Sequence, residues 1–158
     1  IHDQQMVTRA LVTKFSRSDD RVNVEVINAG AGHHFPTYMV PKVTFELGYQ
    51  NAEGRFVILA TDIVGWNVDI NLEQEIFDTR IPSGGKRTIS AKLPSDIAKA
   101  TTLQLRISVS PREHYERTFQ SVLDQRDQLD EKTLSLLQAA YDEATATRYQ
   151  FTLSTYQL

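Results

Sequence analysis

The chain has 158 residues, 41% of them hydrophobic and 23% charged, and its formal net charge is -3. This length and balance predict a single globular domain over residues 1–158 with an apolar core, and the negative charge argues against a nucleic-acid or anionic-membrane partner. The absence of cysteine excludes disulfides and thiolate metal sites, and no apolar run approaches the roughly 18–20 residues of a membrane span. The N-terminus lacks the charged and then apolar pattern of a signal peptide, and because the chain starts at Ile1 rather than Met we expect a processed or truncated chain.

Alternating apolar residues predict β-strands through the first half of the chain. The expected strands cover residues 7–15, 21–27, 43–49 and 55–63. Polar residues at 16–20 and the turn at 51–54 join these strands as two hairpins. Trp66, the only tryptophan, closes the fourth strand, and we interpret its ring as a seal at the edge of the core rather than as a ligand-stacking surface.

The second half of the chain contains four more predicted strands. They cover residues 75–81, 86–93, 103–109 and 149–158, with a short helical turn at 95–100. The strand at 103–109 has the clearest alternation of apolar and polar residues, which predicts one buried and one exposed face. Seven or eight short strands with regularly spaced turns predict an antiparallel β-sandwich of immunoglobulin-like shape.

A helical period replaces the alternation at about residues 111–148. Residues 110–113 match a capping box, which predicts a first helix up to about residue 124. On this helix we expect Tyr115 to face the core and His114 to face water. Asp130 is expected to cap a second helix that ends near residue 148. The two helices form a predicted helical hairpin that is inserted before the last strand.

The stretch at residues 28–37, Asn-Ala-Gly-Ala-Gly-His-His-Phe-Pro-Thr, is a loop between two predicted strands. Gly30 and Gly32 permit positive φ and a close backbone approach, and Pro36 restricts its own φ, so we expect a pre-shaped loop. This loop presents two adjacent histidines. Neutral imidazole is the commonest metal ligand and a common axial ligand of haem iron, while adjacent histidines on a loop are also typical of hydrogen-bonded surface structure.

The loop and the Val-x-Val-x-Val strand before it resemble the β-sandwich domain that follows the haem-binding region in many periplasmic multihaem c-type cytochromes. The motif Asn-x-Gly-Ala-Gly-His-x-Phe-Pro-Thr carries this resemblance by itself. Supporting patterns extend it over nearly the whole chain. Residues 2–3 and 10–11 resemble the lead-in strand of that domain, and residues 51–54 resemble its hairpin turn. Residues 78–85 resemble a connection between its strands, and residues 110–115 resemble its closing strand-to-helix step.

The resemblance implies a site on this loop. The implied cofactor-binding residues are His33, His34, Phe35, Pro36 and Thr37. His33 aligns with the motif histidine, and Thr37 is expected to hydrogen-bond back to it. His33 and His2 are the implied iron ligands, because the family carries histidines near the junction with its haem region. The resemblance also implies a haem c carried by a neighbouring segment or chain, a redox partner protein, and a periplasmic or extracellular location.

The chain departs from that family in one respect. A c-type haem is attached through Cys-x-x-Cys-His, and this chain has no cysteine, so it cannot hold a covalent haem by itself. Either the haem-carrying part lies in another segment or chain, or the domain serves another use.

No nucleophile, phosphate-loop or calcium-loop signature is present in the sequence, so we expect no enzymatic activity of its own. The first hypothesis is a non-catalytic accessory domain of a multihaem c-type electron-transfer cytochrome, which packs against haems and supplies an axial histidine. One alternative is a stand-alone immunoglobulin-like recognition or adhesion module. The other is a small copper or zinc site built from His33, His34 and His2.

Overall fold

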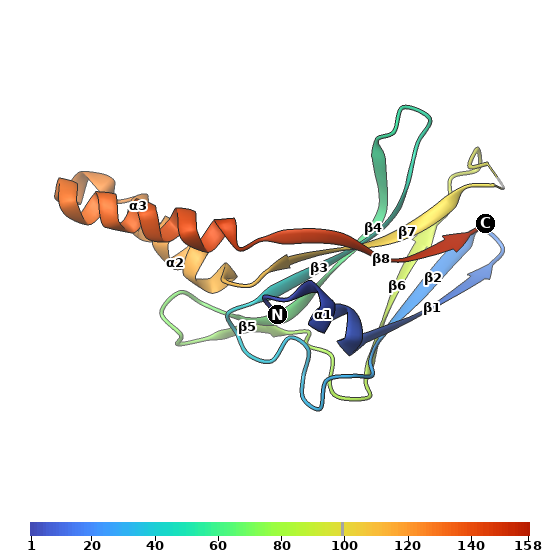
Figure 1. The fold of residues 1–158 in the computed structure, drawn as a ribbon, viewed down its shortest axis with the longest axis horizontal. Helices are drawn as coiled ribbons and strands as arrows, with labels where there is room; N and C mark the ends of the chain where they lie inside the picture. Colours follow the sequence, from blue (N-terminus) through green and yellow to red (C-terminus); the bar gives the residue numbers. More distant parts are fainter. Residues whose placement is uncertain (99) are drawn as a thin grey trace.

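The structure, a computed structural model, describes residues 1–98 and 100–158. Within this described part, eight strands form two antiparallel sheets that pack face to face (Figure 1). The smaller sheet has the order β1-β2-β6 and consists of β1 Leu11–Ser18, β2 Arg21–Asn28 and β6 Lys86–Lys92. The larger sheet has the order β5-β4-β3-β7-β8 and consists of β3 Lys42–Gln50, β4 Phe56–Val68, β5 Glu75–Asp78, β7 Thr102–Ser110 and β8 Tyr149–Gln157. The predicted β-sandwich is therefore confirmed.

The core lies between the two sheets. Val22, Val24 and Val26 of β2 are fully buried, and they share one cluster with the buried side chains of β3 and β7, which include Phe45 and Ile107. Because each such side chain contributes about 1.5–3 kcal/mol when it leaves water, this face sets the register of the strands. The alternation predicted for β2, β3 and β7 is present in the burial of their residues.

The N-terminal segment is a helix where a strand was predicted. Helix α1 covers Gln4–Ala10, and β1 begins only at Leu11. The carboxylate of Asp3 caps α1, because it accepts hydrogen bonds from the backbone N–H groups of Gln5 and Met6 at 2.7 and 3.3 Å. The prediction of a strand over residues 7–10 was wrong, since the Asp3 cap starts a helix that buries Val7 and continues to Ala10.

Strand β4 also differs from the prediction. It continues through Trp66 to Val68, because Trp66 pairs with Asp78 of β5 and the backbone stays extended. Strand β5 ends at Asp78, three residues before the predicted end, and Ile81 instead forms an isolated bridge with Phe35. The predicted helical turn at 95–100 includes residue 99, which lies outside the described residues; residues 95 and 96 form a turn.

The predicted helical hairpin is present and projects from the sandwich as an arm (Figure 1). It consists of α2 Glu113–Leu123, the 3-10 helix η1 Arg126–Gln128 and α3 Glu131–Ala146. Asp130 caps α3 as predicted, since its carboxylate accepts from the N–H of Thr133 at 2.9 Å. The predicted capping box at Ser110 is wrong. Ser110 pairs with Lys42 in the sheet and stays extended, so α2 begins three residues later, with no side-chain cap.

The orientation of α2 reverses the prediction for two of its residues. His114 is buried, with 5% of its surface exposed, whereas Tyr115 is 47% exposed. The N–H of His114 donates to the carbonyl of Val40 at 3.1 Å, which turns this side of α2 toward the sandwich. Tyr115 instead stacks on Phe119, with ring centroids 6.3 Å apart, and both rings line a hollow between α2 and α3. The prediction failed because the buried face at the base of the arm is polar.

Candidate functional site

The loop between β2 and β3 crosses from one sheet to the other and is organised around a buried side chain, Asn28. The side-chain amide of Asn28 donates to the carbonyls of His33 and Ile81 at 2.7 and 3.0 Å. Its oxygen accepts from the N–H of Ala31 at 3.1 Å. A buried asparagine with these three partners holds the loop in one shape. The sequence did not lead us to predict a role for Asn28 in the site, although Asn28 is the first residue of the loop motif.

Gly30 joins the loop to helix α1. The N–H groups of Ala29 and Gly30 both donate to the carbonyl of Ala10 at 3.0 Å. A Cβ at Gly30 would overlap with the carbonyl oxygen of Arg9 and lie 3.0 Å from the Cα of Ala10. The close backbone approach predicted for Gly30 is therefore present. Gly30 does not use the positive φ that glycine permits, because the glycines with positive φ in the described residues are Gly54 and Gly84.

Phe35 and Pro36 anchor the far end of the loop in the core. Both side chains are buried, and the peptide bond between them is cis. Phe35 and Ile81 exchange two backbone hydrogen bonds of 2.8 Å, which tie the loop to the segment after β5. These anchors leave the two histidines before Phe35 exposed to solvent.

One nitrogen of the His33 ring, Nδ1, is within hydrogen-bonding distance of two loop oxygens. Its Nδ1 lies 2.9 Å from the carbonyl oxygen of His34 and 3.2 Å from the hydroxyl oxygen of Thr37, so the predicted contact with Thr37 is present. A carbonyl accepts only, which favours the tautomer with the proton on Nδ1 and a lone pair on Nε2. No described residue hydrogen-bonds to Nε2 of His33. This is the arrangement in which a histidine coordinates a metal.

Arg80 supports the loop from the side of β5. Its guanidinium donates to both carboxylate oxygens of Asp78 at 2.9 and 2.6 Å and to the carbonyl of Thr37 at 3.0 Å. The same guanidinium lies 4.5 Å from the centroid of the Trp66 ring. Hydrogen bonds from Arg80 hold the pKa of Asp78 below its ordinary value. Arg80 was not among the residues predicted for the site. The pattern Asp-x-Arg at residues 78–80 is the feature of the sequence that could have indicated its role.

The ring of Trp66 lies under Arg80 rather than open to a ligand. Its indole N–H donates to a carboxylate oxygen of Glu75 at 2.7 Å. The cation above the ring and the hydrogen bond at its edge make Trp66 part of the support beneath the loop. This placement agrees with the interpretation of Trp66 as a structural residue at the edge of the core.

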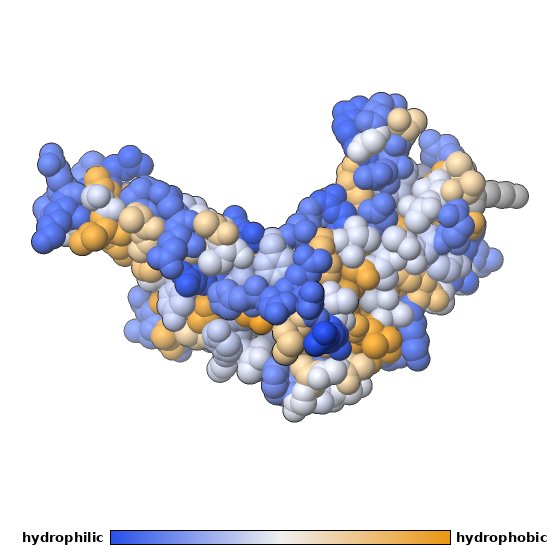
Figure 2. All heavy atoms as spheres, viewed as in Figure 1, coloured by the Kyte–Doolittle hydropathy of each residue, from blue (hydrophilic) through white to orange (hydrophobic). Residues whose placement is uncertain are grey.

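A groove of about 470 Å³ separates α1 from the loop. Its lining residues are Ile1, Met6, Val7, Arg9, Ala10, Gly30, Ala31, Gly32, His33, Phe35, Pro36 and Thr37. Over the region of α1, hydrophobic and hydrophilic surface lie beside each other (Figure 2). We call this hollow the α1 groove. Four of the predicted cofactor-binding residues line it together, and they come from the second half of the loop.

His34 and His2 lie outside the lining of the α1 groove. His34 is exposed, and its charge contributes to lowering the pKa of Asp78 after the larger effect of Arg80. His2 is exposed at the start of the chain. Among the described residues, no three histidine, aspartate or glutamate side chains gather as a metal-binding group. The structure therefore does not bring His2, His33 and His34 together as a copper or zinc site.

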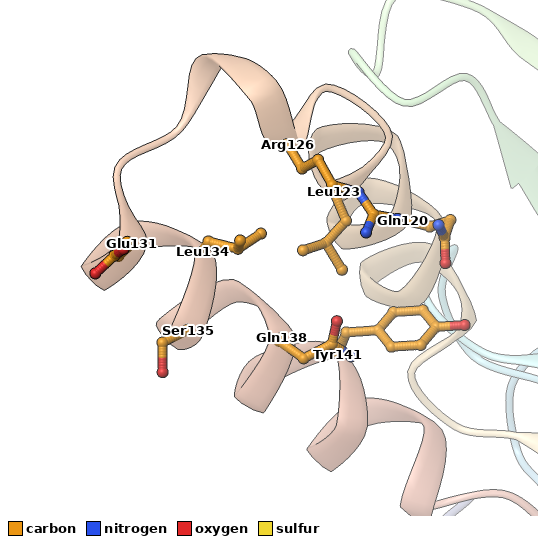
Figure 3. Close-up of a pocket in the computed structure, with 8 residues that line it drawn as sticks. All are labelled: Gln120, Leu123, Arg126, Glu131, Leu134, Ser135, Gln138 and Tyr141. Atoms are coloured by element: carbon orange, nitrogen blue, oxygen red, sulfur yellow. The ribbon is translucent and has the colours of Figure 1, made fainter.

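Another hollow, of about 360 Å³, lies inside the helical arm (Figure 3). Leu123 of α2 and Leu134 of α3 point toward each other across it, and the ring of Tyr141 lies beneath Leu123. Apolar side chains that face each other between two helices are typical of helix packing. We therefore interpret this hollow as the interior of the arm.

None of the helices in the described part of the chain has the length and apolar composition that crossing a bilayer requires.

The fold and the groove together define an antiparallel β-sandwich with an inserted helical arm and a histidine at the rim of an apolar groove. No family model and no curated protein matches the sequence. Among solved structures, the chain is similar to a penta-heme cytochrome c552 from Thermochromatium tepidum, with a TM-score of 0.58 and 13% identity. The similarity covers 98% of this chain and 40% of the cytochrome chain. At this identity the likeness shows a common fold.

Proposed function

We propose that this chain is a non-catalytic accessory domain of a multihaem c-type cytochrome. In this proposal the α1 groove covers a haem held by another segment or chain, and His33 supplies an axial ligand to its iron. A redox partner protein and a periplasmic or extracellular location follow from the same proposal, because c-type cytochromes of this kind transfer electrons outside the cytoplasm.

The observation that carries the proposal is the geometry of His33. Its Nδ1 is engaged by the carbonyl of His34 and the hydroxyl of Thr37, and Nε2 is left for a partner. The hydrogen bonds of Asn28 and Gly30 restrain the backbone on which this ring is carried. A ring with one fixed nitrogen and one available nitrogen is prepared for coordination, since little conformational entropy remains to be lost on binding.

The α1 groove suits a flat and mainly apolar cofactor. Val7, Phe35 and Pro36 are buried at its base, and polar side chains lie at its rim. Its volume falls within the range of roughly 300–1,000 Å³ that is usual for small-molecule and cofactor sites. When bound, a haem supplies one-electron transfer. The apolar base would keep water from its edge, which lowers the local dielectric and changes the reduction potential.

The fold comparison supports this proposal without deciding it. A solved structure with a similar fold is a penta-heme cytochrome, and this chain is similar to 40% of it. Because the sequence lacks cysteine, any covalent haem must belong to another segment or chain.

The test uses a short haem c peptide that provides one histidine ligand and leaves the other axial position open. The 158-residue chain is titrated with this peptide, and the absorption and electron paramagnetic resonance spectra are recorded. We expect the low-spin spectrum of bis-histidine iron with the native chain, and its loss with His33→Ala. His34→Ala is the matched control and should retain it. An unchanged low-spin complex in His33→Ala would contradict the proposal.

A further inference from the structure

A guanidinium with an open hydrogen-bonding capacity lies at the rim of the α1 groove. Arg9 is in the last turn of α1, its side chain is exposed, and it lines the groove together with His33. Among the described residues, no hydrogen bond or ion pair engages this guanidinium. Of the described residues that line the groove, Arg9 is the one with a charged side chain, so no carboxylate there competes for it.

The backbones that carry Arg9 and His33 are joined directly. Gly30 packs against the carbonyl of Arg9, and the next carbonyl, that of Ala10, accepts two hydrogen bonds of 3.0 Å from the loop. Because the end of α1 and the loop are held as one unit, the backbones that carry the two side chains keep a defined relation across the groove. A ligand that contacts both must have two matching groups on a rigid body.

The lining of the groove specifies what those groups are. His33 offers a nitrogen lone pair, which suits a metal centre, and Arg9 offers a planar cation, which suits a carboxylate. The same groove is lined by apolar side chains such as Val7 and Pro36. A ligand with a central metal, an apolar plane and carboxylates on one edge fits this combination of groups.

We propose that Arg9 binds a propionate carboxylate of the haem while His33 contacts the iron. This inference rests on the proposed function and adds a second, independent anchor that sets the rotation of the haem in its plane. A propionate held by Arg9 is fixed relative to the sandwich. The charge of Arg9 also stabilises the anionic form of that propionate.

The test separates the carboxylate from the rest of the haem. Dissociation constants of the 158-residue chain are measured for iron mesoporphyrin and for its dimethyl ester, which has no free carboxylate, in the same detergent. Arg9→Gln should weaken binding of iron mesoporphyrin roughly tenfold, the loss of about one charge-assisted hydrogen bond, and should leave binding of the ester unchanged. Arg9→Lys should recover part of the loss.

Arg55→Gln is the matched control, because Arg55 is an exposed arginine in the turn between β3 and β4, away from α1 (Figure 1). It should bind both porphyrins like the native chain. Equal binding of iron mesoporphyrin by the native chain and Arg9→Gln would overturn the role of Arg9 alone. An equal loss for the acid and the ester would overturn the pairing with a propionate. Failure of the native chain to bind either porphyrin would overturn the proposed function, and this inference with it.

Discussion

The side-chain amide of Asn28 donates a hydrogen bond of 2.7 Å to the backbone carbonyl of His33, five residues further along the chain. Asn28 has no exposed surface, and it ends strand β2, so the loop is fastened to a residue of the sheet. The backbone that carries the His33 ring is thus positioned by a buried side chain.

Replacing Asn28 with alanine should destabilise the fold. The change removes the donor to the carbonyl of His33 and the acceptor for the N–H of Ala31, and each group left unsatisfied costs about 1–3 kcal/mol. We expect the free energy of unfolding in urea to fall by at least that amount. Asn71→Ala is the control, because Asn71 is exposed, and it should change the value by less than about 0.5 kcal/mol. Equal stability of the two variants would show that Asn28 is not the organising residue.

The two loop glycines should respond oppositely to alanine. At Gly30 the added Cβ would overlap with the backbone of Arg9, whereas at Gly32 it would meet nothing within 4 Å. We expect Gly30→Ala to lower the free energy of unfolding by about 1–3 kcal/mol, as overpacking does. Gly32→Ala should be neutral or stabilise by up to about 1 kcal/mol, since it reduces the entropy of the unfolded chain. Thermal unfolding of both variants measures this, and the reverse order would refute the contact between α1 and the loop.

Arg80→Gln should reduce stability at neutral pH more than in acid. Hydrogen bonds from Arg80 lower the pKa of Asp78 from 3.8, so the folded state binds fewer protons than the unfolded state. The stabilisation is complete above that ordinary pKa and is lost as pH falls through the lower pKa of the folded state. The difference between the native chain and the variant should therefore shrink below about pH 4, as measured by urea unfolding at several pH values. A difference that is constant with pH would contradict the ion pair.

His114 should make the native chain lose stability between neutral pH and mildly acidic pH. Burial, with a smaller contribution from Arg117, lowers the pKa of His114 from 6.5. The unfolded state then binds the proton more readily, so stability is complete above 6.5 and falls as pH drops toward the lower folded pKa. His114→Gln should flatten the dependence of unfolding free energy between about pH 7 and 5. His2→Gln, which changes an exposed histidine, should leave the slope as it is.

His33→Ala should leave the domain folded and, under the proposed function, change one haem of the cytochrome to which the domain would belong. The ring of His33 is exposed, and its hydrogen-bonding contacts with His34 and Thr37 lie within the loop, so we expect a change in unfolding free energy within about 0.5 kcal/mol. Spectroelectrochemical titration of the parent cytochrome should show one haem with an altered potential and spectrum. Unfolding of the domain with every haem signal unchanged would make His33 a structural residue.

Local patterns in the sequence determined much of the framework. The alternation in residues 21–27 and 103–109 predicted strands with one buried face, because a strand that lies on a core must place every second side chain inside. Asp130 predicted the start of α3, since its capping bond reaches only three residues along the chain. The motif around His33 predicted a shaped loop with a contact from Thr37.

Tertiary contacts decided the rest. Ser110 carries the pattern of a cap but pairs with Lys42 in the sheet, and its backbone stays extended. His114 and Tyr115 exchange their expected environments because residues of the sandwich, Val40 and Lys42, offer polar partners to the start of α2. Gly30 is needed for the approach of a helix from another part of the chain. In each case the deciding partner is far away in the sequence, and only the folded chain shows which of several locally acceptable environments a residue occupies.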